Sequence, residues 1–337
     1  MAEMDIGRRD KRGEWQPGSL PAPSPLFSWP PKLGKIAKHI LGYNGVLWPI
    51  NLFVALISIA IWQWFTPSLE QTATFRIGWI ALIYVRNVVL LIVICGGLHL
   101  RQYMLRAQGL KYRYTDKWLA KNDGKFLFRN QTYDNIFWNV TSGAIIWTAY
   151  EAFSLWLYGN NVIPMITFSS RPIYFVLLMV GVIYLRLIHF YFVHRLIHWP
   201  PLYKSSHYLH HKNVNIGPWS GITMHPIEHV LYFSGAILHW IIPSHPVHMI
   251  FHLIHAGTTA GIGHVGFHRL VGKGDSGLQT DFYFHYLHHR YFTVNFGDES
   301  VPLDKWFGTH LDGSQEELKA MMERRKREKM ATEESVG

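Results

Sequence analysis

Four apolar stretches, each about 20 residues long, constrain the fold of this chain more than any other feature. They cover residues 46–65, 77–98, 135–158 and 172–193. A helix of about 20 residues spans the hydrocarbon core of a bilayer. Because lipid offers no water to open backbone groups, single spanning segments of this kind fold as α-helices. The sequence therefore predicts an all-α membrane protein built on a bundle of about four transmembrane helices.

The composition agrees with a membrane protein. Charged residues make up 16% of the chain and hydrophobic residues 49%, whereas a soluble domain has about 25% charged residues. Three charged side chains, Arg86, Glu151 and Arg186, fall inside the apolar stretches. Because charges in lipid are costly, we expect these side chains to face the interior of the bundle, where an Arg–Glu pair would be structural.

The distribution of positive charge predicts the orientation in the membrane. The connection 99–134 carries eight Lys or Arg and three Asp, whereas the connections 66–76 and 159–171 carry one Arg each. Positively charged loops stay in the cytoplasm, so both termini and the region after the fourth stretch are expected there. The net charge is +10, and the positively charged residues flank apolar segments and form no basic repeat. This distribution favours a membrane surface over a nucleic acid as partner.

We divide the chain into three parts. Residues 1–40 are polar, charged and rich in proline, and predict a disordered cytosolic tail. Residues 41–313 would form the membrane-embedded catalytic domain, followed by a charged tail at 314–337. After the fourth stretch, the apolar segments 230–242 and 247–262 are shorter and predict re-entrant or interfacial helices.

Histidine is the most unusual component of this chain, because 19 of its 21 histidines lie between His189 and His310. Four clusters stand out, at 194–198, 207–211, 264–268 and 285–289. Histidines spaced by three or four residues share one face of a helix. One such pair is weak evidence, but ten imidazoles near lipid need a common cause. The ten are His194, His198, His207, His210, His211, His264, His268, His285, His288 and His289.

Metal binding explains this concentration of histidines. Neutral imidazole binds zinc, copper, iron and nickel. Ten donors exceed the capacity of one ion and suit two ions with five donors each. The single cysteine, Cys95, excludes a thiolate zinc site and an Fe–S cluster held by this chain.

The motifs HRLIH, HYLHH, HVGFH and HYLHH, which begin at His194, His207, His264 and His285, resemble those of the sterol desaturase and fatty acid hydroxylase superfamily of membrane enzymes. The resemblance covers roughly residues 126–313. It includes the segments WSG at 219–221, MHPIEH at 224–229 and DKWFGT at 304–309. It implies a four-helix membrane bundle that carries a cytosolic, histidine-rich, metal-binding cap.

The resemblance also implies how the histidines divide between two iron ions. One ion would be held by His194, His198, His207, His211 and His288, and the other by His210, His264, His268, His285 and His289. The place of His268 varies in the family and can be acidic. No catalytic residue is expected outside these ligands. His225, Glu228 and His229 lie together in HPIEH and either orient ligands, gate the substrate, or have a plain interfacial role.

The implied activity is an O2-dependent oxidation in lipid biosynthesis. It would hydroxylate or desaturate a C–H bond of a sterol, a fatty acyl or sphingolipid chain, or another polar lipid. Zinc has no redox chemistry, so iron is the expected metal. The sequence carries no dinucleotide or haem-binding motif, so cytochrome b5 or a ferredoxin-type donor would supply electrons. The expected location is multi-pass in the endoplasmic reticulum membrane or a bacterial inner membrane.

Two other classes of protein also place histidines in a membrane chain. A metal transporter would hold its ligands near the bilayer midplane, between broken helices. A bis-histidine haem electron-transfer protein would need only two to four axial ligands. Ten histidines clustered at and beyond a helix end are more typical of a dinuclear enzyme.

Overall fold

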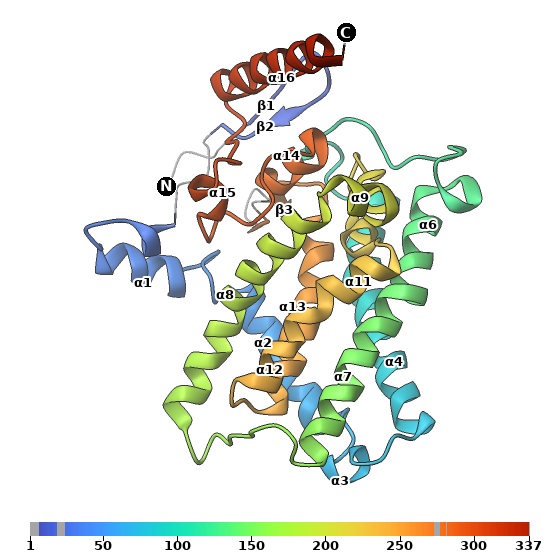
Figure 1. Ribbon diagram of the computed structural model, residues 1–337, viewed down its shortest axis with the longest axis vertical. Coiled ribbons are helices and arrows are strands. Elements are labelled where there is room, and N and C mark those ends of the chain that lie inside the picture. The colour runs from blue at the N-terminus through green and yellow to red at the C-terminus, as the bar shows by residue number, and fades with distance from the viewer. Residues whose placement is uncertain (1–6, 19–23, 273–276, 281, 337) are drawn as a thin grey trace.

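The computed structural model describes residues 7–18, 24–272, 277–280 and 282–336. Helices dominate the fold, and they form a layer of long helices with shorter elements stacked at one end (Figure 1). The strands that the structure describes form two antiparallel hairpins, β1 (Arg8–Arg9) with β2 (Trp15–Gln16), and β3 (Arg269–Val271) with β4 (Gly277–Gln279). The predicted all-α class is therefore confirmed at the level of a mostly helical protein.

The four apolar stretches form long helical segments. The first is α2 (Ile50–Trp64), which is followed by the short α3 (Leu69–Thr72). The second is α4 (Ile77–Leu91), continued by the π-helical turn η2 (Ile92–Gly96), α5 (Gly97–His99) and a second π-helical turn η3 (Leu100–Met104). The third consists of α6 (Gln131–Trp138), η5 (Asn139–Gly143) and α7 (Ala144–Gly159), and the fourth is α8 (Pro172–Ile197).

Two of these segments, Ile77–Met104 and Pro172–Ile197, are long and apolar enough to cross a membrane, and the apolar helix α2 is shorter. The prediction of four spans is thus supported for two of them by length and composition. The other two spans stay a prediction.

The charged side chains inside the apolar stretches face inward, as predicted. Arg86 Nη2 lies 2.5 Å from Glu151 Oε2, and the two side chains are 10% and 0% exposed. Asn87 Nδ2 donates to Thr148 Oγ1 at 3.2 Å beside this pair. The Arg–Glu pair joins α4 to α7. Arg186 of α8 instead donates from Nη2 to the hydroxyl of Tyr232 at 3.0 Å.

The central helix of the fold is α13 (Pro246–Gly263), which is buried along nearly its whole length. It packs against α2, α7 and α8 and against the 3-10 turn η7 (Pro218–Ile222) (Figure 1). Two glycines allow this close approach. A Cβ at Gly257 would lie 2.5 Å from the ring of Trp147, and one at Gly261 would lie 2.4 Å from Cys95 Sγ. The sequence predicts a re-entrant or interfacial helix here. The burial of this segment in the core of the bundle excludes a helix that lies at the surface, and the re-entrant alternative stays a prediction.

The remaining elements follow α8, and several of them build the end that carries the histidines. They are α9 (Pro200–Leu202), η6 (Tyr203–His207), α10 (Tyr208–His211), α11 (Pro226–Phe233), η8 (Ser234–Ile237), α12 (Leu238–Ile241), α14 (Tyr283–Tyr291), α15 (Leu303–Trp306) and α16 (Gln315–Val336). A short 3-10 turn, η4 (Leu127–Arg129), precedes α6. The charged tail predicted at 314–337 is mostly the helix α16, which packs through Met321.

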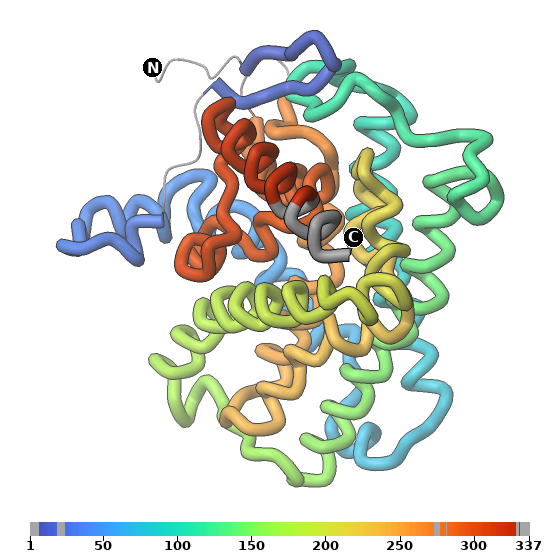
Figure 2. Tube along the Cα trace, turned by 45° about the horizontal axis from the view of Figure 1, so that its top comes forward, coloured from blue at the N-terminus to red at the C-terminus, as the bar shows by residue number. Residues whose placement is uncertain are grey.

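The N-terminal part is more ordered than its composition predicts. It contains the hairpin β1–β2, the 3-10 turn η1 (Pro25–Phe27) and the exposed helix α1 (Leu33–Leu41). Trp15 is 5% exposed, and its backbone N–H donates to the carbonyl of Tyr114 at 2.8 Å. The hairpin lies at the same end of the molecule as α16 (Figures 1 and 2). Residues 1–6 and 19–23 of the predicted disordered tail lie outside the described residues.

Candidate metal centre

Four helical elements and the end of a fifth bring the predicted ligands together. His194 lies on the last turn of α8 and His198 is the C-cap of that helix, His207 ends η6, and His210 and His211 lie on α10. His264 caps α13, and His285, His288 and His289 lie on α14. Adjacent residues on a helix point about 100° apart. For this reason, the adjacent residues His210 and His211 on α10 point to two different groups of histidines, and so do the adjacent residues His288 and His289 on α14.

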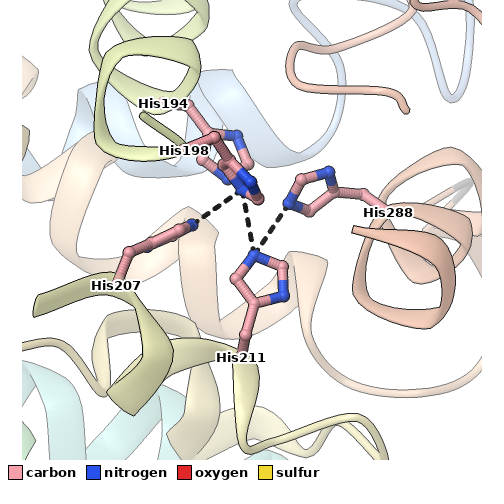
Figure 3. Close-up of side chains that lie close together, drawn as sticks. All are labelled: His194, His198, His207, His211 and His288. Carbon is pink, nitrogen blue, oxygen red and sulfur yellow. Dashed lines mark hydrogen bonds between the residues drawn. The ribbon is translucent and has the colours of Figure 1, made fainter. Parts of the chain in front are cut away.

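The first histidine group consists of His194, His198, His207, His211 and His288, whose ligand atoms all lie within 4.8 Å of one another. The rings converge on one point from α8, η6, α10 and α14 (Figure 3). The Nε2 atom of His198 lies 3.0 Å from that of His207 and 3.1 Å from that of His211. His288 Nε2 lies 3.0 Å from His211 Nε2.

Oxygen acceptors hold the other nitrogen of several of these rings. His194 Nδ1 donates to the carbonyl of Phe296 at 2.6 Å, and His288 Nδ1 donates to the carbonyl of Val294 at 2.6 Å. A carbonyl only accepts, so in the neutral rings Nδ1 carries the hydrogen and Nε2 carries a lone pair. This is the tautomer that binds a metal through Nε2 while the other nitrogen is anchored by the protein.

The short contacts within the first histidine group cannot all be hydrogen bonds between neutral rings, because each Nε2 either donates or accepts. His288 Nε2 accepts, so the single hydrogen on His211 Nε2 is donated to it and cannot also serve the contact with His198. His211 Nε2 then has no lone pair with which to accept a hydrogen from His198, so the contact between these two rings is not a hydrogen bond. A cation at the convergence point satisfies every ring.

The second histidine group consists of His210, His264, His285 and His289, again with ligand atoms within 4.8 Å of one another. His264 Nδ1 donates to the carbonyl of Ala260 at 2.8 Å. Its Nε2 therefore offers one lone pair, yet it lies 3.0 Å from Nε2 of both His285 and His289. The donor chemistry of this group fits a second cation in the same way.

Burial keeps these imidazoles neutral. It lowers the pKa of His207, His211 and His288 in the first group, and of His285 and His289 in the second, well below the usual value. Neighbouring histidines lower these pKa values further, because each ring disfavours a positive charge on the next. Neutral imidazole is the form that binds metal ions.

His268 does not join either group. The sequence prediction paired it with His264 on one helix face, but α13 ends at Gly263 and the chain turns through Gly266 at φ +79°. The i,i+4 spacing therefore has no helix beneath it. The ring of His268 instead packs against Trp15, with ring centroids 5.1 Å apart, and His268 lines the cavity described below. The helix face that the spacing implied therefore ends before His268.

The HPIEH segment divides into one residue at the site and two away from it. Glu228 Oε1 lies 2.7 Å from His207 Nδ1, and both side chains are 1% exposed. His229 is buried elsewhere, bonded to Ser142 Oγ at 2.9 Å and to the carbonyl of Ile222 at 2.9 Å. His225 accepts from the backbone N–H of Ile227 and caps α11. Of the three, Glu228 has the position expected for a residue that orients a ligand.

A cavity of about 620 Å³, called the site cavity below, reaches both histidine groups. His194 and His207 line it from the first group, and His210, His264 and His285 from the second. Apolar side chains form much of the remaining wall, and its polar positions include Arg186, Tyr232, His255, Asp298 and Glu299. The apolar part of the wall is lined, among others, by Ile183, Leu187, Phe190, Val193, Met224 and Phe284. A cavity of this character accepts an amphipathic molecule.

Several residues that shape the site carry no sequence signal. The carbonyls of Phe296 and Val294 fix ligand tautomers, but any residue offers a carbonyl. Phe190 stacks on His194 with ring centroids 4.8 Å apart. Arg186 did carry a signal, as a costly charge within an apolar stretch, and its position in the cavity wall was not predicted from it.

Comparisons with known proteins agree with these motifs. A family model for fatty acid hydroxylases matches residues 178–309. The Delta(7)-sterol 5(6)-desaturase ERG3B of Gibberella zeae is 28% identical over 141 residues, which cover 40% of this chain and 43% of that protein. The Delta(7)-sterol 5(6)-desaturase of Candida glabrata is 29% identical over 145 residues, covering 42% of this chain and 39% of the relative.

A plant protein shows a similar match. The Delta(7)-sterol-C5(6)-desaturase of Nicotiana tabacum is 29% identical over 150 residues, 41% of this chain and 52% of that relative. The chain thus spans about half the length of the curated relatives it matches. No solved structure matches the chain.

The fold and the site together define a mostly helical protein with apolar segments and two converging groups of buried imidazoles. The match over residues 178–309 and the sterol desaturase relatives support a place for this chain in the sterol desaturase and fatty acid hydroxylase superfamily.

Proposed function

We propose that this chain is a membrane oxidoreductase that uses two iron ions and O2 to hydroxylate or desaturate a C–H bond of a lipid. The observation that carries the proposal is the pair of histidine groups at the wall of a largely apolar cavity. In each group, the short contacts between Nε2 atoms cannot all be hydrogen bonds between neutral rings. Iron supplies the redox chemistry that zinc lacks, and imidazole is a suitable ligand for it.

The first ion would be held by the five members of the first histidine group and the second by the four members of the second group. We do not include His268 among the proposed ligands, because its ring packs against the ring of Trp15. The second group would hold its ion with four protein donors and would leave room for a further ligand, as catalytic metal sites do.

The tasks of the protein itself are orientation and exclusion. Glu228 and the carbonyls of Phe296 and Val294 fix ring orientation, so that the Nε2 lone pairs point inward before an ion binds. The apolar wall of the site cavity would hold a lipid carbon near the ligands and keep bulk water out. Arg186, oriented by Tyr232, would meet the polar part of the lipid.

A sterol is the first candidate for the substrate, because the relatives are named as sterol desaturases. A fatty acyl or sphingolipid chain is the second, since the family model that matches is that of fatty acid hydroxylases. Desaturation and hydroxylation share an initial hydrogen abstraction, so one experiment on lipids tests both.

We further propose that four segments span the membrane and place the histidine groups on the cytoplasmic side, in the endoplasmic reticulum or a bacterial inner membrane. The excess of Lys and Arg in 99–134 supports this orientation. Cytochrome b5 or a ferredoxin-type protein would then reach the site from the cytoplasm, drawn by the positive net charge.

The test is a comparison of lipid extracts from cells that express the wild-type chain and cells that express His285→Ala. Mass spectrometry should find a lipid that gains one oxygen or loses two hydrogens in the wild type alone. Identical extracts, with both proteins present in the membrane fraction, would refute an oxidative function in those cells. Elemental analysis of the purified wild type should find two iron ions per chain.

A further inference from the structure

A second hollow, called the lateral groove below, lies beside the site cavity. It has a volume of about 440 Å³ and runs between α2 and α8, and α13 provides a residue at its floor. Side chains that line it include Trp48, Leu52, Ala55, Met179, Val180 and Phe251. Among the described residues that line this groove, Asn51 is the one with a polar functional group other than an indole. The groove is therefore suited to a hydrocarbon chain.

Asn51 and Ile183 belong to the walls of both hollows. Asn51 Nδ2 donates to the carbonyl of Val46 at 2.6 Å, and Asn51 Oδ1 accepts from His255 Nε2 at 2.7 Å. Both ends of its amide are therefore engaged in hydrogen bonds within the protein. Ile183 lies on α8 and is 4% exposed. The lateral groove and the site cavity thus share this pair of residues in their walls.

The outer edge of the lateral groove lies on surfaces that suit lipid. Val176 on α8 is 53% exposed, and α8 is one of the two helices with the length and composition of a membrane span. On the other edge, Trp48 and Leu52 are 46% and 41% exposed. In a bilayer, these apolar edges would open toward the lipid phase rather than toward water.

We propose that the hydrocarbon part of the lipid substrate enters sideways from the bilayer, through the lateral groove and past Asn51 and Ile183, into the site cavity. This inference rests on the proposed function. A lipid on this route keeps its apolar surface away from water throughout, whereas entry through an aqueous mouth would expose that surface first. The entry route would favour substrates that already reside in the membrane.

Photolabelling tests the route without any turnover. The full-length protein is reconstituted in phosphatidylcholine vesicles that contain a fatty acid with a diazirine in its chain, and labelled residues are mapped by mass spectrometry. Phe251 is the diagnostic position, because it lies on the groove but is 1% exposed. Labelling of Phe251 in the wild type means that the chain has entered the groove.

Two variants should close the groove from opposite sides. Met179→Trp on α8 and Ala55→Trp on α2 add bulk to its walls, and each should reduce labelling of Phe251 and of the site-cavity residue Met224 several-fold. Leu177→Trp is the matched control, because Leu177 is 64% exposed on α8 and lines neither hollow. Labelling of the exposed Leu82 should persist in all three variants and report intact insertion.

The outcomes separate the route from the chemistry. Absence of label on Phe251 in the wild type, or equal labelling of Met224 in Met179→Trp and Leu177→Trp, would overturn the lateral route. Labelling needs no bound metal. If labelling follows the expected pattern while no oxidised lipid is found, the groove stands as a lipid entrance and the proposed oxidoreductase function fails.

Discussion

Glu228 Oε1 lies 2.7 Å from His207 Nδ1, with both side chains buried. The carboxylate reaches from α11 to the end of η6, across 21 positions of sequence. It is the carboxyl group that holds a member of the first histidine group, while other rings of that group are held by backbone carbonyls. Burial raises the pKa of Glu228 well above its usual value. A cation bound on the far side of His207 would oppose this shift and favour the ionised carboxylate.

Removal of this carboxylate should weaken metal binding without removing a ligand. We expect Glu228→Gln to lower the affinity of the first ion by about 10- to 100-fold, as is typical when a group that orients a ligand is lost. Competition with a chelator, followed by elemental analysis, measures the effect. His225→Ala is the control, since His225 only caps α11. Equal metal retention in the two variants would contradict the role given to Glu228.

The two clustered histidines of HVGFH should behave differently. His264→Ala removes a member of the second histidine group and should cost one iron ion per chain. His268→Ala should keep both ions, because the ring packs against Trp15 instead. Iron content of the purified variants is the measurement. Loss of an ion in His268→Ala would restore it to the ligand set.

Replacement of the first or the last histidine of the segments 207–211 and 285–289 should abolish lipid oxidation. We expect His207→Ala, His211→Ala, His285→Ala and His289→Ala each to be inactive, since the buried neighbours cannot move to replace a lost donor. His310 lies outside both groups, so the variant His310→Ala should stay active. Product formation in cell extracts, at matched protein levels, decides the matter, and an active His211→Ala would refute the assignment.

The Arg86–Glu151 pair should matter for stability and not for metal content. Arg86→Met leaves the fully buried Glu151 without its cation, which costs roughly 3–5 kcal/mol for buried pairs. The double variant Arg86→Met/Glu151→Gln should recover part of this loss. Thermal unfolding in detergent compares the three proteins. A double variant less stable than Arg86→Met would show that the pair is not the source of the effect.

Acid should destabilise the metal-free protein. Burial lowers the pKa of His264 to about 4, from its usual value near 6.5. The unfolded chain therefore binds protons that the folded chain does not, and stability falls as pH drops from about 6.5 toward 4. After chelation, the unfolding temperature should decrease over this window and stay nearly level above it. In His264→Gln the decrease should be shallower, and an identical slope would contradict the assignment.

The orientation in the membrane can be measured directly. In a Cys95→Ala background, a cysteine placed at Thr309 should react with an impermeant reagent only from the cytoplasmic side. The positive connection 99–134 and four spans predict this result. Labelling from outside intact cells would reverse the orientation and remove the argument for a cytoplasmic electron donor.

The sequence by itself determined the local parts of the site. Histidines four residues apart in 194–198, 207–211 and 285–289 lie on helical segments and share one histidine group, as the 3.6-residue period predicts. The inward Arg86–Glu151 pair was predictable from the cost of charge in lipid. Such inferences succeed because they depend on neighbours along the chain and on the solvent.

Only the tertiary structure decided where local periodicity stops and distant segments meet. The helix α13 ends at Gly263, so His268 leaves the ligand set that its spacing predicted and packs against Trp15, more than 250 residues away in the chain. The burial of α13 and the order of the N-terminal hairpin arise in the same way, from partners that no local pattern specifies. Packing between remote segments depends on the shapes of both surfaces, and a single sequence displays neither until it has folded.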